Sequence, residues 1–185
     1  MTANGPGQST YLLLDIVALL STEKIEYAVI GALAAAVHGV VRASVDADAV
    51  ARITARQLSE LQTKLTALGF TTNLRQGDFD DPIPALLQIS DTYGNRVDLL
   101  AGLRGLDMDA YSRAVEIPFA DSSLRVIGRE DFIAMKVFAG GPLDMSDARR
   151  AIAVSGESLD TALLLQLAGK FGADVQRACE QLLVR

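Results

Sequence analysis

Residues 27–50 read YAVIGALAAAVHGVVRASVDADAV, and this stretch carries the strongest signals for the fold. Residues 27–30 form a short apolar run that Gly31 stops, which is typical of a buried strand. Residues 32–37 are rich in alanine and favour a helix, and Gly39 is placed to end that helix. The stretch therefore predicts a strand, a turn at glycine and a short helix of small residues.

Asp46 and Asp48 follow on a second extended segment, residues 45–53. Because side chains alternate along a strand, both carboxylates point to the same side of a sheet. Two such charges about 4 Å apart repel by roughly 4 kcal/mol at an effective dielectric of about 20. The pair needs a bound cation, a shared proton or bulk water, and its hydrophobic flanks make bulk water alone the weaker explanation. The alternative is a pair of solvent-facing acids at a sheet edge.

The rest of the chain predicts an α/β (α+β) fold with a small mixed β-sheet flanked by helices and a helical C-terminal part. Further strands are expected at 70–74, 85–90, 96–100, 114–119 and 123–126. Helices are expected at 11–20, from the N-cap Thr54 to Gly69, weakly at 106–113, and at 129–139, 146–153, 159–168 and 173–183. Residues 76–84, with three Asp and two Pro, predict a loop. We expect a core at 1–127 and a helical subdomain at 128–185 packed on it, because the junction is too short for a flexible linker.

Composition limits the classes of function. Half of the 185 residues are hydrophobic, and the net charge of −6 gives no global basic surface, although it leaves room for a local basic groove. The single cysteine, Cys179, excludes an internal disulfide and is expected to be a small core residue. The longest apolar stretch, residues 27–41, is too short to span a membrane, and residues 1–10 lack the basic region of a signal peptide. A cytoplasmic protein without a membrane partner is expected.

A third acid, Asp98, stands in the middle of an otherwise apolar strand, where an unpaired charge is costly. It either joins Asp46 and Asp48 or pairs with Arg96 or Arg104 near a turn. His38, the only histidine, lies at the end of an apolar helix and is expected to be structural.

Two further features favour phosphate binding, each with a plain alternative. A glycine at the position of Gly31 lets a ligand approach the backbone, and the helix start behind it offers free N–H groups to a phosphate; the alternative is a simple bend. Lys136 is followed by Asp144 and Asp147. The alternatives are a solvated lysine and two carboxylates that cap a helix start.

The order of these residues resembles the nucleotidyltransferase superfamily that includes DNA polymerase β. Its motif is a hydrophobic strand, Gly-Gly or Gly-Ser, a spacer, an Asp-x-Asp pair and a third acid on a later strand. The stretch from Ile30 to Gly39, with Arg42 and Ser44 before the Asp pair, is most similar to the minimal branch that contains abortive-infection type toxins. The resemblance spans about residues 27–150. Ala32 departs from it where the family has the second Gly or Ser, and Leu143 departs where many toxin relatives have Arg.

The resemblance implies the chemistry of the acids. Asp46 and Asp48 would bind Mg²⁺, or Mn²⁺ in its place, together with the triphosphate of an incoming NTP. Asp98 would help to hold a second metal ion and would activate the hydroxyl of the acceptor.

The resemblance also implies which residues bind the nucleotide. Gly31 and Ala32 would contact a phosphate through the backbone. Ser44 and Arg42 would orient the metal loop or a phosphate, and Lys136 would contact a phosphate or the base. The expected activity is transfer of a nucleoside monophosphate to a hydroxyl of RNA, a protein or a small molecule. The alternative is a non-catalytic binding module that keeps the fold and acts beside a partner protein.

Overall fold

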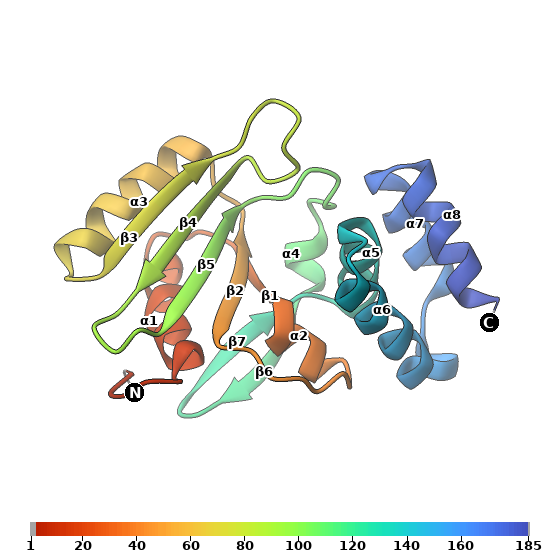
Figure 1. Ribbon diagram of the computed structural model, residues 1–185, viewed down its shortest axis with the longest axis horizontal. Coiled ribbons are helices and arrows are strands. Elements are labelled where there is room, and N and C mark those ends of the chain that lie inside the picture. The colour runs from red at the N-terminus through yellow and green to blue at the C-terminus, as the bar shows by residue number, and fades with distance from the viewer. Residues whose placement is uncertain (1–2, 185) are drawn as a thin grey trace.

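The computed structural model describes residues 3–184, and within this range seven strands form one mixed sheet in the order β3-β4-β5-β2-β1-β7-β6 (Figure 1). The strands are β1 (Tyr27–Ile30), β2 (Asp46–Ala51), β3 (Thr71–Gln76), β4 (Ala85–Ser90), β5 (Arg96–Ala101), β6 (Val115–Phe119) and β7 (Ser122–Val126). The mixed sheet with flanking helices and a helical C-terminal part confirms the predicted fold class. Every predicted strand is present, with ends shifted by one or two residues where they differ.

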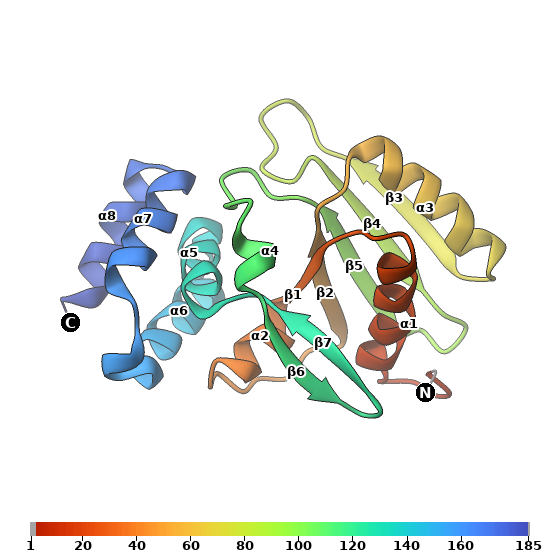
Figure 2. The same cartoon turned by 180° about the vertical axis from the view of Figure 1, so that it is seen from behind.

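Helices cover the sheet unequally. The helices are α1 (Ser9–Thr22), α2 (Gly31–Val37), α3 (Ala55–Ala67), α4 (Ala110–Arg113), α5 (Arg129–Ala139), α6 (Pro142–Ser155), α7 (Thr161–Phe171) and α8 (Ala173–Leu183), with a 3₁₀ turn at Gly156–Ser158. Helices α1 and α3 cover one face of the sheet, and α5 to α8 lie together at one side of the molecule (Figures 1 and 2). Every helix within residues 3–184 is too short or too polar to cross a bilayer.

Local signals explain the best predicted elements. The Thr54 hydroxyl accepts a hydrogen bond from the Gln57 backbone N–H at 3.2 Å, and the Gln57 side chain accepts one from the Thr54 backbone N–H at 3.0 Å. This capping box satisfies two N–H groups that the first turn of α3 leaves without helical partners. The leucines of α3 that recur at helical spacing are buried against the sheet: Leu58, Leu61 and Leu65.

Two predicted helices differ most from the observed bounds. The weak helix at 106–113 is only α4, because the Asp107 carboxylate accepts a hydrogen bond from the Asp109 backbone N–H at 2.7 Å and forms a turn that competes with helix. The helix expected at 146–153 begins at Pro142. Proline has no N–H, and none is needed in the first turn of a helix.

The junction between the sheet and the C-terminal helices is short. Strand β7 ends at Val126 and α5 begins at Arg129. The Ile127 backbone N–H donates to the Val29 carbonyl at 3.0 Å, and the Ile127 carbonyl lies 2.8 Å from His38 Nε2. The junction is therefore fixed to β1 and α2. The division into units at 127 and 128 stays a prediction.

Candidate active site

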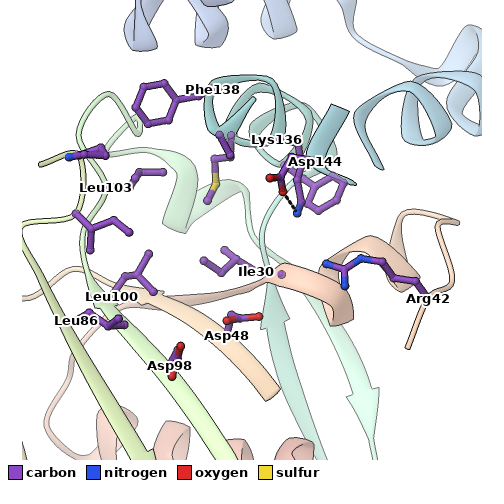
Figure 3. A pocket seen from close by; sticks show the side chains of 16 residues that line it. Ile30, Arg42, Asp48, Leu86, Asp98, Leu100, Leu103, Lys136, Phe138 and Asp144 are labelled. Carbon is purple, nitrogen blue, oxygen red and sulfur yellow. Dashed lines mark hydrogen bonds and ion pairs between the residues drawn. The ribbon is translucent and has the colours of Figure 1, made fainter. Parts of the chain in front are cut away.

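A cavity of about 430 Å³ lies between the face of the sheet that α1 and α3 leave uncovered and helix α5 (Figure 3). One part of its lining is polar: Gly31, Arg42, Asp48, Asp98, Lys136 and Asp144. The larger part is apolar: Ile30, Pro82, Ile83, Leu86, Leu100, Leu103, Phe132, Met135, Phe138 and Ala139. The cavity therefore combines charged side chains with an apolar wall. Most of that wall comes from β4, β5, α5 and the loops beside the two strands.

Asp48 and Asp98 stand side by side at this cavity. Strands β2 and β5 are parallel, and their register places the two residues directly opposite each other. Burial, and then the charge of each neighbouring acid, raises the pKa of the Asp48 carboxyl above its ordinary value. Burial also raises the pKa of Asp98, against the lowering effects of Arg96 and Gln88. Burial is the main cause of both shifts, and it favours the protonated form of each carboxyl.

Gly31 is required by the position of Asp48. Its φ of +65° lies in the left-handed region, and a β-carbon on it would lie 2.8 Å from the Asp48 carboxyl carbon. A side chain there would be strained and would displace the carboxylate. Gly31 is thus more than a bend, because it makes room for the acid on the neighbouring strand. Ala32, which follows it in α2, is buried and is not part of the cavity lining.

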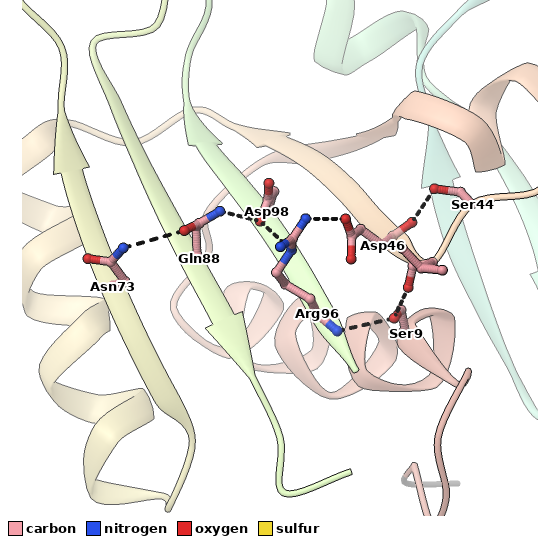
Figure 4. Close-up of polar contacts among 8 residues, drawn as sticks. Ser9, Ser44, Asp46, Asn73, Gln88, Arg96 and Asp98 are labelled. Carbon is pink, nitrogen blue, oxygen red and sulfur yellow. Dashed lines mark hydrogen bonds and ion pairs between the residues drawn. The ribbon is translucent and has the colours of Figure 1, made fainter. Parts of the chain in front are cut away.

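Asp46 does not line the cavity. An Arg96 Nη group forms an ion pair with its carboxylate, and Arg96 Nε lies 3.6 Å from an Asp98 oxygen (Figure 4). We call Asp46, Asp48, Asp98 and Arg96 the acid cluster. Among residues 3–184, no three His, Cys, Asp or Glu side chains converge as a ready-made metal site. The structure thus brings Asp48 and Asp98 to the cavity and holds Asp46 beside it.

Gln88 was not identified from the sequence. Its Nε2 donates to an Asp98 oxygen at 3.4 Å, and its Oε1 accepts from Asn73 Nδ2 at 3.4 Å (Figure 4). The predicted hairpin of residues 85–100 carried the signal, because pairing outward from the turn places Gln88 opposite Asp98. The apolar wall carried no comparable signal, since its residues come from four separate parts of the chain.

The positive side chains of the cavity are already paired. Lys136 Nζ lies 2.6 Å from Asp144 and 3.2 Å from Asp147, and Arg42 Nε donates to Asp147 at 3.2 Å. We call Arg42, Lys136, Asp144 and Asp147 the helix-side network. Asp147 is only 1% exposed, so its two cationic partners compensate a buried charge. The alternative of a solvated lysine is therefore wrong, because the Lys136 side chain is only 12% exposed. Asp144 does lie in the first turn of α6, as the helix-start alternative expects, although it makes no capping hydrogen bond, whereas Asp147 lies beyond that turn.

Ser44 and His38 lie outside the cavity lining. The exposed Ser44 hydroxyl donates to the Asp46 carbonyl at 3.1 Å, so it holds the start of β2. His38 Nε2 lies 2.8 Å from the Ile127 carbonyl, and burial lowers the pKa of the imidazole. These contacts agree with a structural His38. Cys179 is fully buried, as expected.

Several solved structures have an architecture similar to that of this chain. The antibiotic-resistance factor ANT(2″)-Ia, in complex with adenylyl-2″-tobramycin, superposes with a TM-score of 0.62 at 17% identity, covering 89% of this chain and 99% of that one. The chain has a nucleotidyltransferase-like α/β fold. An antigenic nucleotidyltransferase-like protein of Paracoccidioides brasiliensis gives a TM-score of 0.52 at 16% identity over 96% of this chain and 95% of that one. The lincosamide antibiotic adenylyltransferase LnuA gives 0.50 at 16% identity over 82% of this chain and 99% of that one.

No family model and no curated protein sequence matches the chain. The likeness to these nucleotidyltransferases therefore rests on three-dimensional structure at low identity, and it establishes the fold. The activity, the roles of individual residues and the toxin-like branch stay predictions.

Proposed function

We propose that this protein is a metal-dependent nucleotidyltransferase that moves a nucleoside monophosphate from an NTP to an acceptor hydroxyl. One observation carries the proposal. Asp48 and Asp98 are register neighbours on parallel strands, they face one cavity, and Gly31 leaves room for the Asp48 carboxylate. Two adjacent, partly buried carboxylates are stabilised by a cation, which a metal–triphosphate substrate would bring.

The donor set fits Mg²⁺, with Mn²⁺ as a substitute, because it consists of carboxylate oxygens and lacks sulfur and imidazole. Asp48 and Asp98 would hold the ion, and Asp46 would join them when its carboxylate leaves Arg96. When bound, such an ion neutralises the charge that develops on the phosphates during transfer.

The chain's own residues supply the proton transfer. The acceptor oxygen forms a bond to the α-phosphorus while the bond to the β-phosphate oxygen breaks, and pyrophosphate leaves. The hydroxyl proton passes to an Asp98 carboxylate oxygen. Asp98 is placed for this role because it lines the cavity directly beside Asp48.

The nucleotide phosphates would lie at the polar end of the cavity. Arg42 uses Nε in its bond to Asp147, and its terminal Nη groups, directed toward the cavity, are placed to meet a phosphate (Figure 3). Lys136 would share its ammonium between Asp144 and a phosphate. Gly31 and Ala32 would act through backbone N–H groups, and Ser44 through the start of β2.

The composition of the cavity wall supports a small molecule as the acceptor. A mostly apolar wall suits a small molecule that carries its hydroxyl on a largely apolar frame. ANT(2″)-Ia and LnuA, whose names identify antibiotics as their substrates, favour a small acceptor over a macromolecule. RNA and protein hydroxyls, which the toxin-like branch would modify, remain the other acceptor classes to test.

Calorimetry tests the proposal. The wild-type protein is titrated with each of the four NTPs in Mg²⁺ and again in excess EDTA, and both titrations are repeated with Asp48→Asn. We expect binding that requires Mg²⁺ and that Asp48→Asn removes. The control is Asp121→Asn, which makes the same charge change on the exposed turn between β6 and β7. NTP binding that ignores both Mg²⁺ and Asp48→Asn would refute the proposal.

A non-catalytic binding module is the second candidate. The observation in its favour is that Arg96 pairs with Asp46, so the three acids do not converge on one point. Such a module would bind an NTP and leave it intact. Incubation with α-labelled NTP and a mixture of hydroxyl compounds separates the two candidates, because only the enzyme releases pyrophosphate and transfers the label.

A further inference from the structure

Arg96 is the only positive side chain that the described residues place in direct contact with Asp46. The two residues are opposite each other in the β2–β5 register, and Figure 4 shows the guanidinium between Asp46 and Asp98. The Arg96 backbone is held separately, because its N–H donates to the Ser9 hydroxyl at 3.1 Å. This backbone contact does not involve the guanidinium.

The pairing of Arg96 is incomplete. One Nη group contacts Asp46, while Nε is buried, has no hydrogen-bond partner within residues 3–184 and lies 3.6 Å from Asp98. A guanidinium binds a carboxylate best through two parallel hydrogen bonds, and this geometry lacks them. The Arg96 side chain is also 43% exposed, so water competes with the contact. The ion pair between Arg96 and Asp46 is therefore weaker than a buried, bidentate one, and a competing cation could replace the arginine.

The contact between Arg96 and Asp46 explains why the three carboxylates do not converge on one point. The Asp46 carboxylate is turned to Arg96 and not to the cavity that Asp48 and Asp98 line. A divalent cation that gathers all three carboxylates would compete with the guanidinium for Asp46, because two positive charges so close together repel each other.

We propose that Arg96 is the resident counter-cation of Asp46, and that a divalent cation binding at the acid cluster displaces it into solvent. The inference rests on the proposed metal-dependent function. Arg96 is then a positioning residue that lowers the affinity for free metal ions. Full metal binding is expected only with the metal–NTP complex, whose phosphates supply a new partner for the released guanidinium.

Metal affinity measured without nucleotide tests this inference. Mn²⁺ is titrated into the protein, and free Mn²⁺ is followed by electron paramagnetic resonance. We expect Arg96→Gln to bind Mn²⁺ about tenfold more tightly than the wild type, because a competing unit charge is gone. The control is Arg52→Gln, which removes an arginine of equal charge whose partner is Glu26. It should leave the affinity unchanged.

A measurement on the wild-type chain covers the case in which Arg96→Gln folds poorly. The Arg96 Nε–H resonance is followed by ¹⁵N NMR while Mg²⁺ is added. We expect a saturable shift of this resonance that tracks metal occupancy, together with faster hydrogen exchange as Nε meets water.

The outcomes separate this inference from the proposed function. If Mn²⁺ binds equally to the wild type and to Arg96→Gln, and the Arg96 resonance does not move, Arg96 is a fixed structural partner and only this inference fails. If Arg96→Gln weakens Mn²⁺ binding, Arg96 supports the site, and the inference is again wrong. If Mn²⁺ binds neither protein, with or without an NTP, both the inference and the proposed function are refuted.

Discussion

The cavity is bordered by two charged clusters that have opposite balances. The acid cluster sets three carboxylates against one guanidinium: Asp46, Asp48 and Asp98 with Arg96. The helix-side network sets two carboxylates against two cations: Asp144 and Asp147 with Lys136 and Arg42. The negative and positive charges of the helix-side network balance each other. The acid cluster has more negative than positive charges.

This difference distinguishes carboxylates that are neutralised within the fold from carboxylates that bind a metal ion under the proposed function. Asp147 is nearly inaccessible and contacts both cations, so removing its charge takes the ion-pair partner from Arg42 and one of two partners from Lys136. Asp48 lies between Ile30 on β1 and Asp98 on β5, and burial and the charges of Asp98 and Asp46 raise its pKa, so removing its charge relieves repulsion. Matched substitutions should therefore have opposite effects on stability.

The largest effect is expected on transfer. Asp98→Asn removes the proton acceptor and a metal ligand, and we expect a loss of about a hundredfold to ten-thousandfold in the rate of nucleotidyl transfer. The rate is measured as pyrophosphate released from labelled NTP once an acceptor is found. Asp121→Asn is the control and should keep full activity. An Asp98→Asn variant with wild-type turnover would show that the acid cluster does not carry the chemistry.

The helix-side network gives the next effect. Asp147→Ala should lower the free energy of unfolding by about 3–5 kcal/mol, because it leaves Lys136 and Arg42 without their buried partner. Urea unfolding followed by circular dichroism measures the change. Asp144→Ala is the matched variant: its side chain is 29% exposed, and it should lose about 1 kcal/mol or less. Equal losses for both variants would show that burial does not set the balance of this network.

Gly31 affects both the stability of the fold and the position of the Asp48 carboxylate. Gly31→Ala should lower stability by about 1–2 kcal/mol through the left-handed backbone, and should also remove Mg²⁺-dependent NTP binding by displacing the Asp48 carboxylate. Gly69→Ala separates the two effects, because Gly69 has a φ of +94° and open space around a β-carbon. It should lose similar stability and keep NTP binding. Unchanged NTP binding in Gly31→Ala would show that Asp48 can move without consequence.

The smallest effect has the opposite sign. Asp48→Asn should raise the free energy of unfolding by up to about 1 kcal/mol at neutral pH, because it removes a like-charge pair directly across two strands. The folded protein holds the Asp48 proton more tightly than the unfolded chain does. Wild-type stability from this group is therefore present below the ordinary pKa of 3.8 and is lost as the pH rises through the raised folded pKa.

The pH dependence of the difference checks this sign. Asparagine does not titrate, so the gain from Asp48→Asn should be small at about pH 4 and should reach its full value near pH 7. Chemical unfolding of both proteins at the two pH values measures it. A gain that shrinks toward neutral pH would mean that Asp48 is well compensated in the folded state.

Several features of the site were predictable, and the reasons are local. The turn at Gly31 follows from a glycine between an apolar run and an alanine-rich segment. The common direction of the Asp46 and Asp48 carboxylates follows from the alternation of a strand, but their surroundings do not. Arg96 was considered only as a partner of Asp98, whereas it also contacts Asp46, because the β2–β5 register is parallel and joins segments far apart in the chain.

The sequence alone predicts the strands and helices and the turn at Gly31, because these depend on residues within a few positions of one another. Only the tertiary structure decided that Asp48 and Asp98 are adjacent and that Asp46 is held by Arg96. It also decided that Arg42 and Lys136 share the buried Asp147. Strand register and the packing of α5 against the sheet set these contacts, and both depend on burying the whole core at once.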